Sequence, residues 1–145
     1  MKTNLPLIFY ADDDAAFLQL FQLNNGENGP TYQIKCFASG DDLIESMSKL
    51  HQQFSLLPHL ILLDLHMPAK DGIEVLEELK AHPDFKHIPV VIISDSEDPA
   101  KQKRVLELGA EEFIPKPMAY SGITDIISQI DDHLPKEGIK EAEKD

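Results

Sequence analysis

Four side chains that together suit phosphoryl and metal chemistry each stand just after a short apolar run. Asp12 and Asp13 follow one such run, Asp64 follows a second, and Lys116 follows a third. Short apolar runs bounded by turn residues predict buried strands. Ligands of an open parallel sheet bind at the carboxyl ends of its strands. If the three strands are neighbours, an acidic cluster and an ammonium group share one pocket, which suits a divalent cation and a phosphoryl group.

Apolar runs and helical periodicities alternate five times along the chain. The expected strands cover residues 5–11, 32–37, 60–64, 88–93 and 111–115. The expected helices cover residues 14–24, 39–54, 71–82, 99–108 and 123–134, and the turn-rich residues 25–31 form a loop. Alternation of this kind predicts an α/β fold, in which a doubly wound parallel sheet carries helices on both faces.

Three of these elements carry more specific expectations. The uninterrupted Leu and Ile residues at 60–63 indicate a strand that is buried on both faces. The helix at residues 99–108 has little apolar surface, so it should be loosely held, and Gly109 would end it as a C-cap. Pro115 cannot donate a ladder hydrogen bond, which places the fifth strand at an edge of the sheet.

The composition limits the classes of function. The chain has 145 residues, 42% hydrophobic and 27% charged, which predicts one domain at residues 1–135 and a charged, frayed tail at residues 136–145. Its net charge of −13 argues against nucleic-acid binding, which needs clustered Lys and Arg. The single Cys36 excludes an internal disulfide and fits a reducing compartment, the cytoplasm. No apolar run is long enough to span a membrane, and Pro6 and the acidic residues after it argue against a signal peptide.

Four sequence motifs occur in the same order as in a known family. They are Ala11-Asp12-Asp13-Asp14, Asp64-Leu65-His66-Met67-Pro68-Ala69-Lys70-Asp71-Gly72, Ile92-Ile93-Ser94 and Lys116-Pro117. From about residue 5 to residue 134, the chain therefore resembles the receiver domain of two-component response regulators, of the stand-alone, single-domain type. Each motif alone is common, but all four in order, each closing an expected strand, are specific. The resemblance implies a flavodoxin-like (βα)5 fold with strand order 2-1-3-4-5.

By this resemblance, Asp64 accepts a phosphoryl group from a sensor histidine kinase or a phosphotransfer protein. A Mg²⁺ ion would remove the repulsion between the carboxylate and the phosphate, and it prefers oxygen ligands. Asp13 and Asp64 are the expected carboxylate ligands, with Asp12 bound directly or through water, and the resemblance adds the backbone carbonyl of His66. Lys116 would supply a positive charge to the phosphoryl oxygens. The resemblance also implies a cis bond before the proline that follows this lysine.

The resemblance assigns a conformational switch to Ser94 and Phe113. Ser94 would hydrogen-bond the phosphoryl group, and Phe113 would turn inward as that hydroxyl moves. The family usually has Ala or Gly directly after the hydroxyl residue. This chain has Asp95 there, whose carboxylate either narrows access to the site or points outward. His66 and Ser96 lie where the family tunes the lifetime of the phosphoryl group.

Each motif also has a plain structural interpretation. The acidic run at residues 12–14 can serve only as an N-cap for the first helix, and Lys116 taken alone is typical of a solvated surface residue. A patch formed by Lys101, Lys103 and Arg104 either is solvated or contacts a partner. The order and spacing of all four motifs favour the functional interpretation for the acidic run and for Lys116.

Three functions compete. The first is a phosphoacceptor without separate substrate turnover. Because no effector domain follows, it would signal through a separate protein, a phosphorelay step or a homodimer, with no nucleic-acid or membrane partner. The second is a Mg²⁺-dependent aspartyl phosphohydrolase, which usually has a second Asp where this chain has His66. The third is a receiver-like adaptor that is never phosphorylated. A flavin site is disfavoured, because no loop after the first strand is shaped to wrap a phosphate without metal.

Overall fold

The structure of the protein is a computed structural model, which describes residues 5–23, 32–53, 56–67, 69–95, 98–117 and 122–134. In these residues, five strands alternate with five helices. The strands are β1 (Leu7–Ala11), β2 (Gln33–Phe37), β3 (Leu60–Leu63), β4 (Val90–Ser94) and β5 (Glu112–Pro115). The helices are α1 (Ala15–Leu23), α2 (Gly40–Gln52), α3 (Gly72–Ala81), α4 (Pro99–Glu107) and α5 (Ile123–Asp131). The element order agrees with the strand–helix alternation predicted from the sequence.

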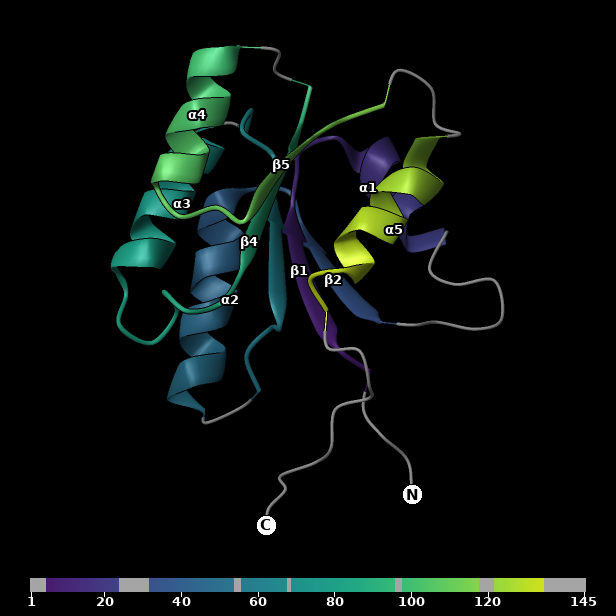
Figure 1. Ribbon diagram of the computed structural model, residues 1–145. Helices are drawn as coiled ribbons and strands as arrows, with labels where there is room; N and C mark the ends of the chain where they lie inside the picture. The colour runs from purple at the N-terminus through teal and green to yellow at the C-terminus, as the bar shows by residue number, and fades with distance from the viewer. Residues whose placement is uncertain are drawn as a thin grey trace.

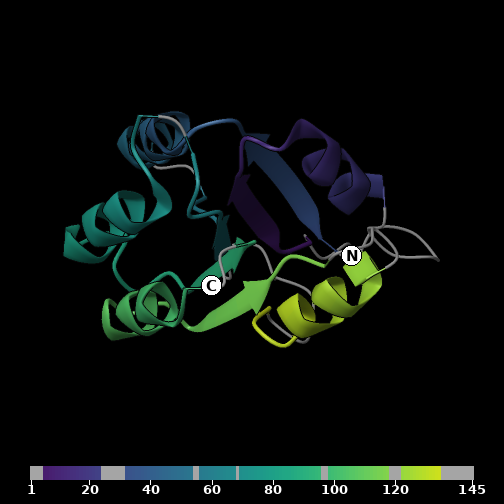
Figure 2. The same ribbon diagram turned by 90° about the horizontal axis from the view of Figure 1, so that it is seen from above.

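The strands form one parallel sheet in the order β2-β1-β3-β4-β5. This order confirms the flavodoxin-like prediction, and β5 is at the edge that Pro115 requires. Two α-helices, α1 and α5, cover one face of the sheet, and α2, α3 and α4 cover the other (Figures 1 and 2). Because every crossover returns each strand in the same direction, the carboxyl ends of all five strands lie at one rim.

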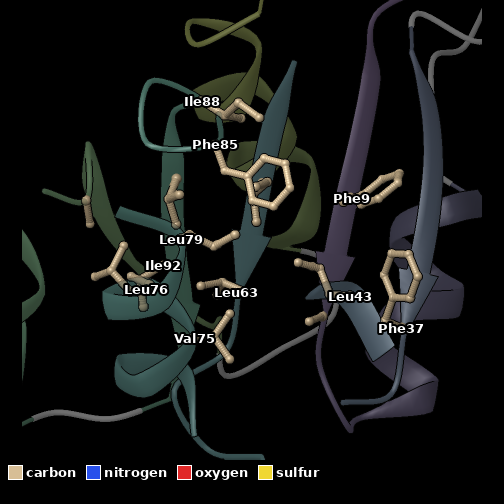
Figure 3. Packing of buried hydrophobic residues seen from close by; sticks show 14 of the residues in the cluster. Phe9, Phe37, Leu43, Leu63, Val75, Leu76, Leu79, Phe85, Ile88 and Ile92 are labelled. Carbon is tan, nitrogen blue, oxygen red and sulfur yellow. The ribbon is translucent and has the colours of Figure 1, made fainter. Parts of the chain in front are cut away.

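The central strand β3 is buried on both faces, as its Leu and Ile residues predict. Successive side chains of a strand point to opposite faces. Ile61 and Leu63 therefore enter the core under α2, α3 and α4, whereas Leu60 and Leu62 enter the core under α1 and α5. Figure 3 shows the first of these cores, in which Leu63 lies among side chains from the covering helices and the neighbouring strands.

Helix α4 is the least buried of the helices, as expected from its sequence. Val105 is its one buried residue, and Leu106 is 48% exposed. Its N-terminus is capped by the Asp98 side chain, which accepts a hydrogen bond from the Ala100 amide at 2.9 Å. Gly109 comes directly after the C-cap residue Leu108 and has φ of 111°, a left-handed conformation that favours glycine and ends the helix where the sequence predicts. The helix is thus well defined at both ends but weakly anchored by apolar contacts.

Some boundaries differ from the prediction, and other expectations concern residues outside the described ranges. The fourth strand begins at Val90 rather than residue 88, because the Ile88 amide donates to the Phe85 carbonyl and completes a turn. The predicted loop at 25–31, Phe54, Ser96 and the tail at 136–145 lie outside the described residues. No helix in the described residues is long and apolar enough to cross a membrane.

Candidate functional site

The pairing of the strands brings the ends of β1, β3 and β5, with the predicted site residues that follow them, to one rim of the sheet. Ala11 pairs with Leu63 in the ladder between β1 and β3, so Asp12 and Asp64 follow directly at the same level. The Asp64 amide donates to the Ala11 carbonyl at 3.0 Å and continues this ladder beyond the strand. At the far edge, the Lys116 amide donates to the Ser94 carbonyl at 2.9 Å. Segments far apart in sequence thus present side chains to one place.

Three carboxylates gather at this rim. One oxygen from each of Asp12, Asp13 and Asp64 lies within 4.8 Å of the others, close enough for a single cation to draw them together. Asp12 and Asp64 are buried, whereas Asp13 is exposed. The donors are oxygen atoms, which suits hard cations such as Mg²⁺ and Mn²⁺ better than zinc. The residues present therefore fit a divalent cation of this kind.

Lys116 supplies the positive charge of the site. Its Nζ atom lies 2.9 Å from Oδ2 of Asp12, 3.0 Å from Oδ2 of Asp64 and 4.0 Å from Oδ2 of Asp14. The ammonium group also lies 5.1 Å from the centre of the Phe17 ring. Burial alone lowers the pKa of Lys116, but its hydrogen bonds to the two buried carboxylates outweigh burial and raise the pKa. Lys116 is therefore held as a cation against the acidic cluster.

Asp12 is the most enclosed member of the cluster. Its Oδ1 accepts a hydrogen bond from the Asp14 amide at 2.9 Å, and its Oδ2 accepts one from the Tyr10 hydroxyl at 3.0 Å. Burial raises the pKa of Asp12 to about 6. The hydrogen bonds from Lys116 and the Asp14 amide oppose this rise, and the charge of Asp64 adds to it. Tyr10 is not among the site residues predicted from the sequence, although residues two apart on a strand share a face.

The loop after β3 holds Asp64 in place. Oδ1 of Asp64 accepts a hydrogen bond from the His66 amide at 3.1 Å, while Oδ2 faces Lys116. The loop folds back where the Gly72 amide donates to the Leu65 carbonyl at 3.0 Å. A Cβ at Gly72 would collide with the Asp64 carbonyl and the Leu65 backbone, so this close return requires glycine.

The predicted cis bond between Lys116 and Pro117 is wrong, because the structure has no cis peptide bond in its described residues. The trans form is intrinsically favoured by about 0.5–1 kcal/mol. The side chain of Lys116 reaches both Asp12 and Asp64 from the trans backbone, so the geometry needs no cis bond.

Comparison with known proteins decides the family. The family model of the response regulator receiver domain matches residues 8–128. The chain belongs to this family. Two-component response regulator ARR8 of Arabidopsis thaliana is 35% identical over 102 residues, which are 70% of this chain and 43% of that protein. This receiver spans about half the length of the curated relatives that it matches.

Solved receiver structures resemble this one over nearly the whole chain. The phosphorylated cyanobacterial phytochrome response regulator RcpA has a TM-score of 0.78 at 30% identity, with 90% of this chain and 94% of that chain covered. The Mn²⁺-bound form of response regulator Rcp1 has a TM-score of 0.75 at 28% identity, with 93% and 99% covered. The acidic cluster thus occurs on a fold whose relatives have been seen phosphorylated and metal-bound.

The two residues assigned to the switch lie on neighbouring strands of the receiver. Ser94 ends β4 and is fully buried. Phe113, on β5, is half-buried and packs against the core under α2, α3 and α4. The sheet register pairs Ser94 with Pro115 and Ile92 with Phe113. Phe113 therefore lies diagonally from Ser94, on the adjacent strand and two residues before the residue that pairs with Ser94.

Two exposed polar side chains, Asp95 and His66, follow β4 and β3. The Asp95 side chain is 75% exposed, and its Oδ1 lies 3.9 Å from Nε2 of His66, whose side chain is 50% exposed. Of the two alternatives for Asp95, the structure shows the carboxylate directed toward His66 and solvent. Ser96, which with His66 was expected to tune the phosphoryl lifetime, lies outside the described residues.

A cavity of about 340 Å³ opens beside the acidic cluster. Its lining consists of Asp13, Leu65, His66, Met67, Asp71, Ile73 and Lys101. Lys101 and Lys103 both belong to α4, but they differ in their surroundings. Lys101 lines the cavity, whereas Lys103 is exposed and does not line it. The sequence grouped both lysines in one basic patch, because it does not show which side of the helix faces the loop after β3.

Proposed function

We propose that this receiver accepts a phosphoryl group on Asp64 from a phosphohistidine of a sensor kinase or a phosphotransfer protein. The observation that carries the proposal is the contact of Lys116 with both Asp64 and Asp12, beside the cluster that Asp13 completes. A carboxylate that receives phosphate needs neighbouring cations, because charge builds on the phosphoryl oxygens during transfer.

In the proposed reaction, an oxygen of Asp64 forms a bond to phosphorus while the bond between phosphorus and the donor imidazole nitrogen breaks. The electron pair of that bond returns to the imidazole, and the product is an acyl phosphate. A Mg²⁺ ion bound by Asp13 and Asp64, by Asp12 directly or through water, and by the His66 carbonyl would neutralise charge on the phosphoryl oxygens. The cavity beside Asp13 offers space for the incoming donor.

The proposed role of Lys116 follows from its present contacts. Its ammonium group bridges two carboxylates, and when Asp64 carries phosphate the same group would contact a phosphoryl oxygen. Asp12 would keep the lysine near the reaction, because its fully buried carboxylate contacts the ammonium group at 2.9 Å independently of Asp64. Lys116 would thus stabilise the transferred group without leaving the site.

The signal would pass from Ser94 and Phe113 to α4. In this proposal, the Ser94 hydroxyl turns toward the phosphoryl group and Phe113 turns further into the space beside it. Helix α4 is suited to respond, because Val105 is its one buried residue. The changed surface would then be recognised by a partner protein in the cytoplasm, and no separate substrate would be turned over.

The adaptor alternative depends on Asp95, whose negatively charged carboxylate lies 3.9 Å from the imidazole of His66, a residue that lines the cavity beside the cluster. If this charge only slows an anionic donor, Asp95→Ala should be phosphorylated about two to three times faster than wild type at low salt. If Asp95 blocks the site, wild type should stay unmodified and the variant should gain phosphate. Acetyl phosphate is a suitable small donor for this comparison.

The test of the proposed function is intact mass spectrometry after incubation with acetyl phosphate and MgCl₂. The proposal expects wild type to gain the mass of one phosphoryl group and Asp64→Asn to gain none. Asp84→Asn is a matched control, because Asp84 is a surface carboxylate in the loop between α3 and β4. Wild type that gains no phosphate, or Asp64→Asn that still gains it, would contradict the proposal.

A further inference from the structure

Tyr10 places a buried hydroxyl group in the acidic cluster. Residues two apart on a strand point to the same face, so Tyr10 on β1 lies below Asp12 on the side of α1 and α5. Its hydroxyl donates to Oδ2 of Asp12 at 3.0 Å, and both residues are fully buried. The ring is fixed edge-on against Phe17 at 6.5 Å and Phe21 at 5.3 Å between centroids.

Both carboxylate oxygen atoms of Asp12 accept hydrogen bonds from protein donors. The Asp14 amide holds Oδ1 at 2.9 Å, and the Tyr10 hydroxyl holds Oδ2 at 3.0 Å. Lys116 contacts Oδ1 at 3.2 Å and Oδ2 at 2.9 Å. A buried carboxylate has little access to water, so these protein donors determine the orientation of its plane.

Tyr10 and Lys116 differ in which carboxylates of the site they contact. Lys116 also contacts Asp64, so it is shared with the group that reacts. The hydroxyl of Tyr10 contacts Asp12 alone among the carboxylates of the site. Burial raises the pKa of Tyr10 well above its ordinary value, with the charge of Asp12 adding to the effect, so the hydroxyl stays a hydrogen-bond donor.

We propose that Tyr10 is a positioning residue of the divalent-cation site, holding Asp12 in the orientation from which it serves the cation and Lys116. The inference rests on the proposed function only in requiring that the acidic cluster binds Mg²⁺. Tyr10 acts through Asp12 and does not itself touch the cation. Without the hydroxyl of Tyr10, Oδ2 of Asp12 keeps only its contact with Lys116, which is shared with Asp64, so the carboxylate is held less firmly and the cation would lose part of a prearranged ligand set.

The test compares Tyr10→Phe with Tyr32→Phe by calorimetric titration with MgCl₂. Tyr10→Phe keeps the packed ring and removes only the hydroxyl. Tyr32 is an equally buried tyrosine of the same core, but it precedes β2 at the end of the sheet opposite Asp12. We expect Mg²⁺ to bind about five to ten times more weakly to Tyr10→Phe, and Tyr32→Phe to stay within about twofold of wild type.

A spectroscopic measurement on folded protein accompanies the titration. Mg²⁺ should perturb the near-ultraviolet absorption of tyrosine in wild type and in Tyr32→Phe, because the phenol of Tyr10 is bonded to a group of the cation site. The perturbation should vanish in Tyr10→Phe. A cation affinity of Tyr10→Phe equal to wild type, an equal loss in Tyr32→Phe, or no tyrosine signal in wild type that binds Mg²⁺ would overturn the inference alone. Wild type that binds no Mg²⁺ would overturn the proposed function with it.

Discussion

The Nζ atom of Lys116 lies 3.0 Å from Oδ2 of Asp64, although 52 residues separate them in the sequence. Both side chains are almost completely buried, with exposed fractions of 11% and 4%. A buried ammonium and a buried carboxylate are stable together because each compensates for the water that the other has lost. Asp64, the proposed phosphoacceptor, therefore lies next to the ammonium group that would stabilise its phosphorylated form.

Replacing Lys116 should remove most of the phosphorylation rate. We expect Lys116→Met to react with acetyl phosphate at least about a hundredfold more slowly, because one charge that stabilises the transferring group is lost. Quenched-flow or timed intact-mass measurements would give the rate. Lys35→Met is the matched control, since Lys35 is an exposed lysine on β2. A rate for Lys116→Met equal to that of Lys35→Met would exclude this role.

The raised pKa of Asp12 predicts that the metal-free protein becomes less stable to unfolding as the pH rises. The folded protein holds a proton on Asp12 up to about pH 6, whereas the unfolded chain releases it near the ordinary value of 3.8. Between these values the folded state binds more protons, so this group's contribution to the free energy of unfolding falls as the pH rises. The contribution is lost above about pH 6.

The variant Asp12→Asn isolates this effect. Its free energy of unfolding relative to wild type should increase between pH 4 and pH 7 in buffer with a chelator, by about 1–3 kcal/mol. Urea unfolding at a series of pH values would measure the difference. A difference that is constant across this range would show that Asp12 titrates normally in the folded protein.

Divalent cations should stabilise the folded receiver. Carboxylates within 4.8 Å of one another repel by roughly 3 kcal/mol per charged pair at an effective dielectric constant near 20. Millimolar MgCl₂ should therefore raise the melting temperature by a few degrees over protein with a chelator. Asp13→Asn should lose most of this shift, because it removes one of the three carboxylates expected to bind the cation. An unchanged melting temperature in wild type would count against a cation site.

Lys101 should promote the approach of anionic donors. It lines the cavity beside Asp13, whereas Lys103 is exposed on the same helix. We expect Lys101→Gln to slow phosphorylation by acetyl phosphate about two- to fivefold at low salt, and Lys103→Gln to have a smaller effect. The difference should shrink at high salt, because screening weakens electrostatic steering. Equal rates for the two variants at low salt would contradict the assignment.

Much of the architecture could be predicted because the apolar pattern and the fold are consistent with each other. The run at residues 60–63 contains only Leu and Ile, a composition typical of a central parallel strand, and β3 is central. Pro115 restricts its strand to an edge, and Gly109 supplies the left-handed residue after α4. Such residues act through local backbone chemistry, which a sequence displays directly.

The remaining features depend on contacts between distant segments. The bond before Pro117 is trans, although the family resemblance predicted a cis bond, and the contacts of Lys116 with Asp12 and Asp64 join segments that are far apart in the sequence. The place of Lys101 follows from how α4 lies against the loop after β3. The spacing of two residues between Tyr10 and Asp12 indicates that they share a face of the strand. The sequence does not show how deeply this face is buried, because the covering helices determine the burial of a strand residue.

The most direct test of the account is borohydride trapping of the phosphorylated protein, followed by peptide mass spectrometry. Borohydride reduces an aspartyl phosphate to homoserine and leaves phosphoserine and phosphohistidine without this product. After treatment with acetyl phosphate and MgCl₂, we expect homoserine at position 64 and at no other position that holds an aspartate. Homoserine at Asp12 or Asp13 instead, or none in protein that has gained a phosphoryl group, would contradict it.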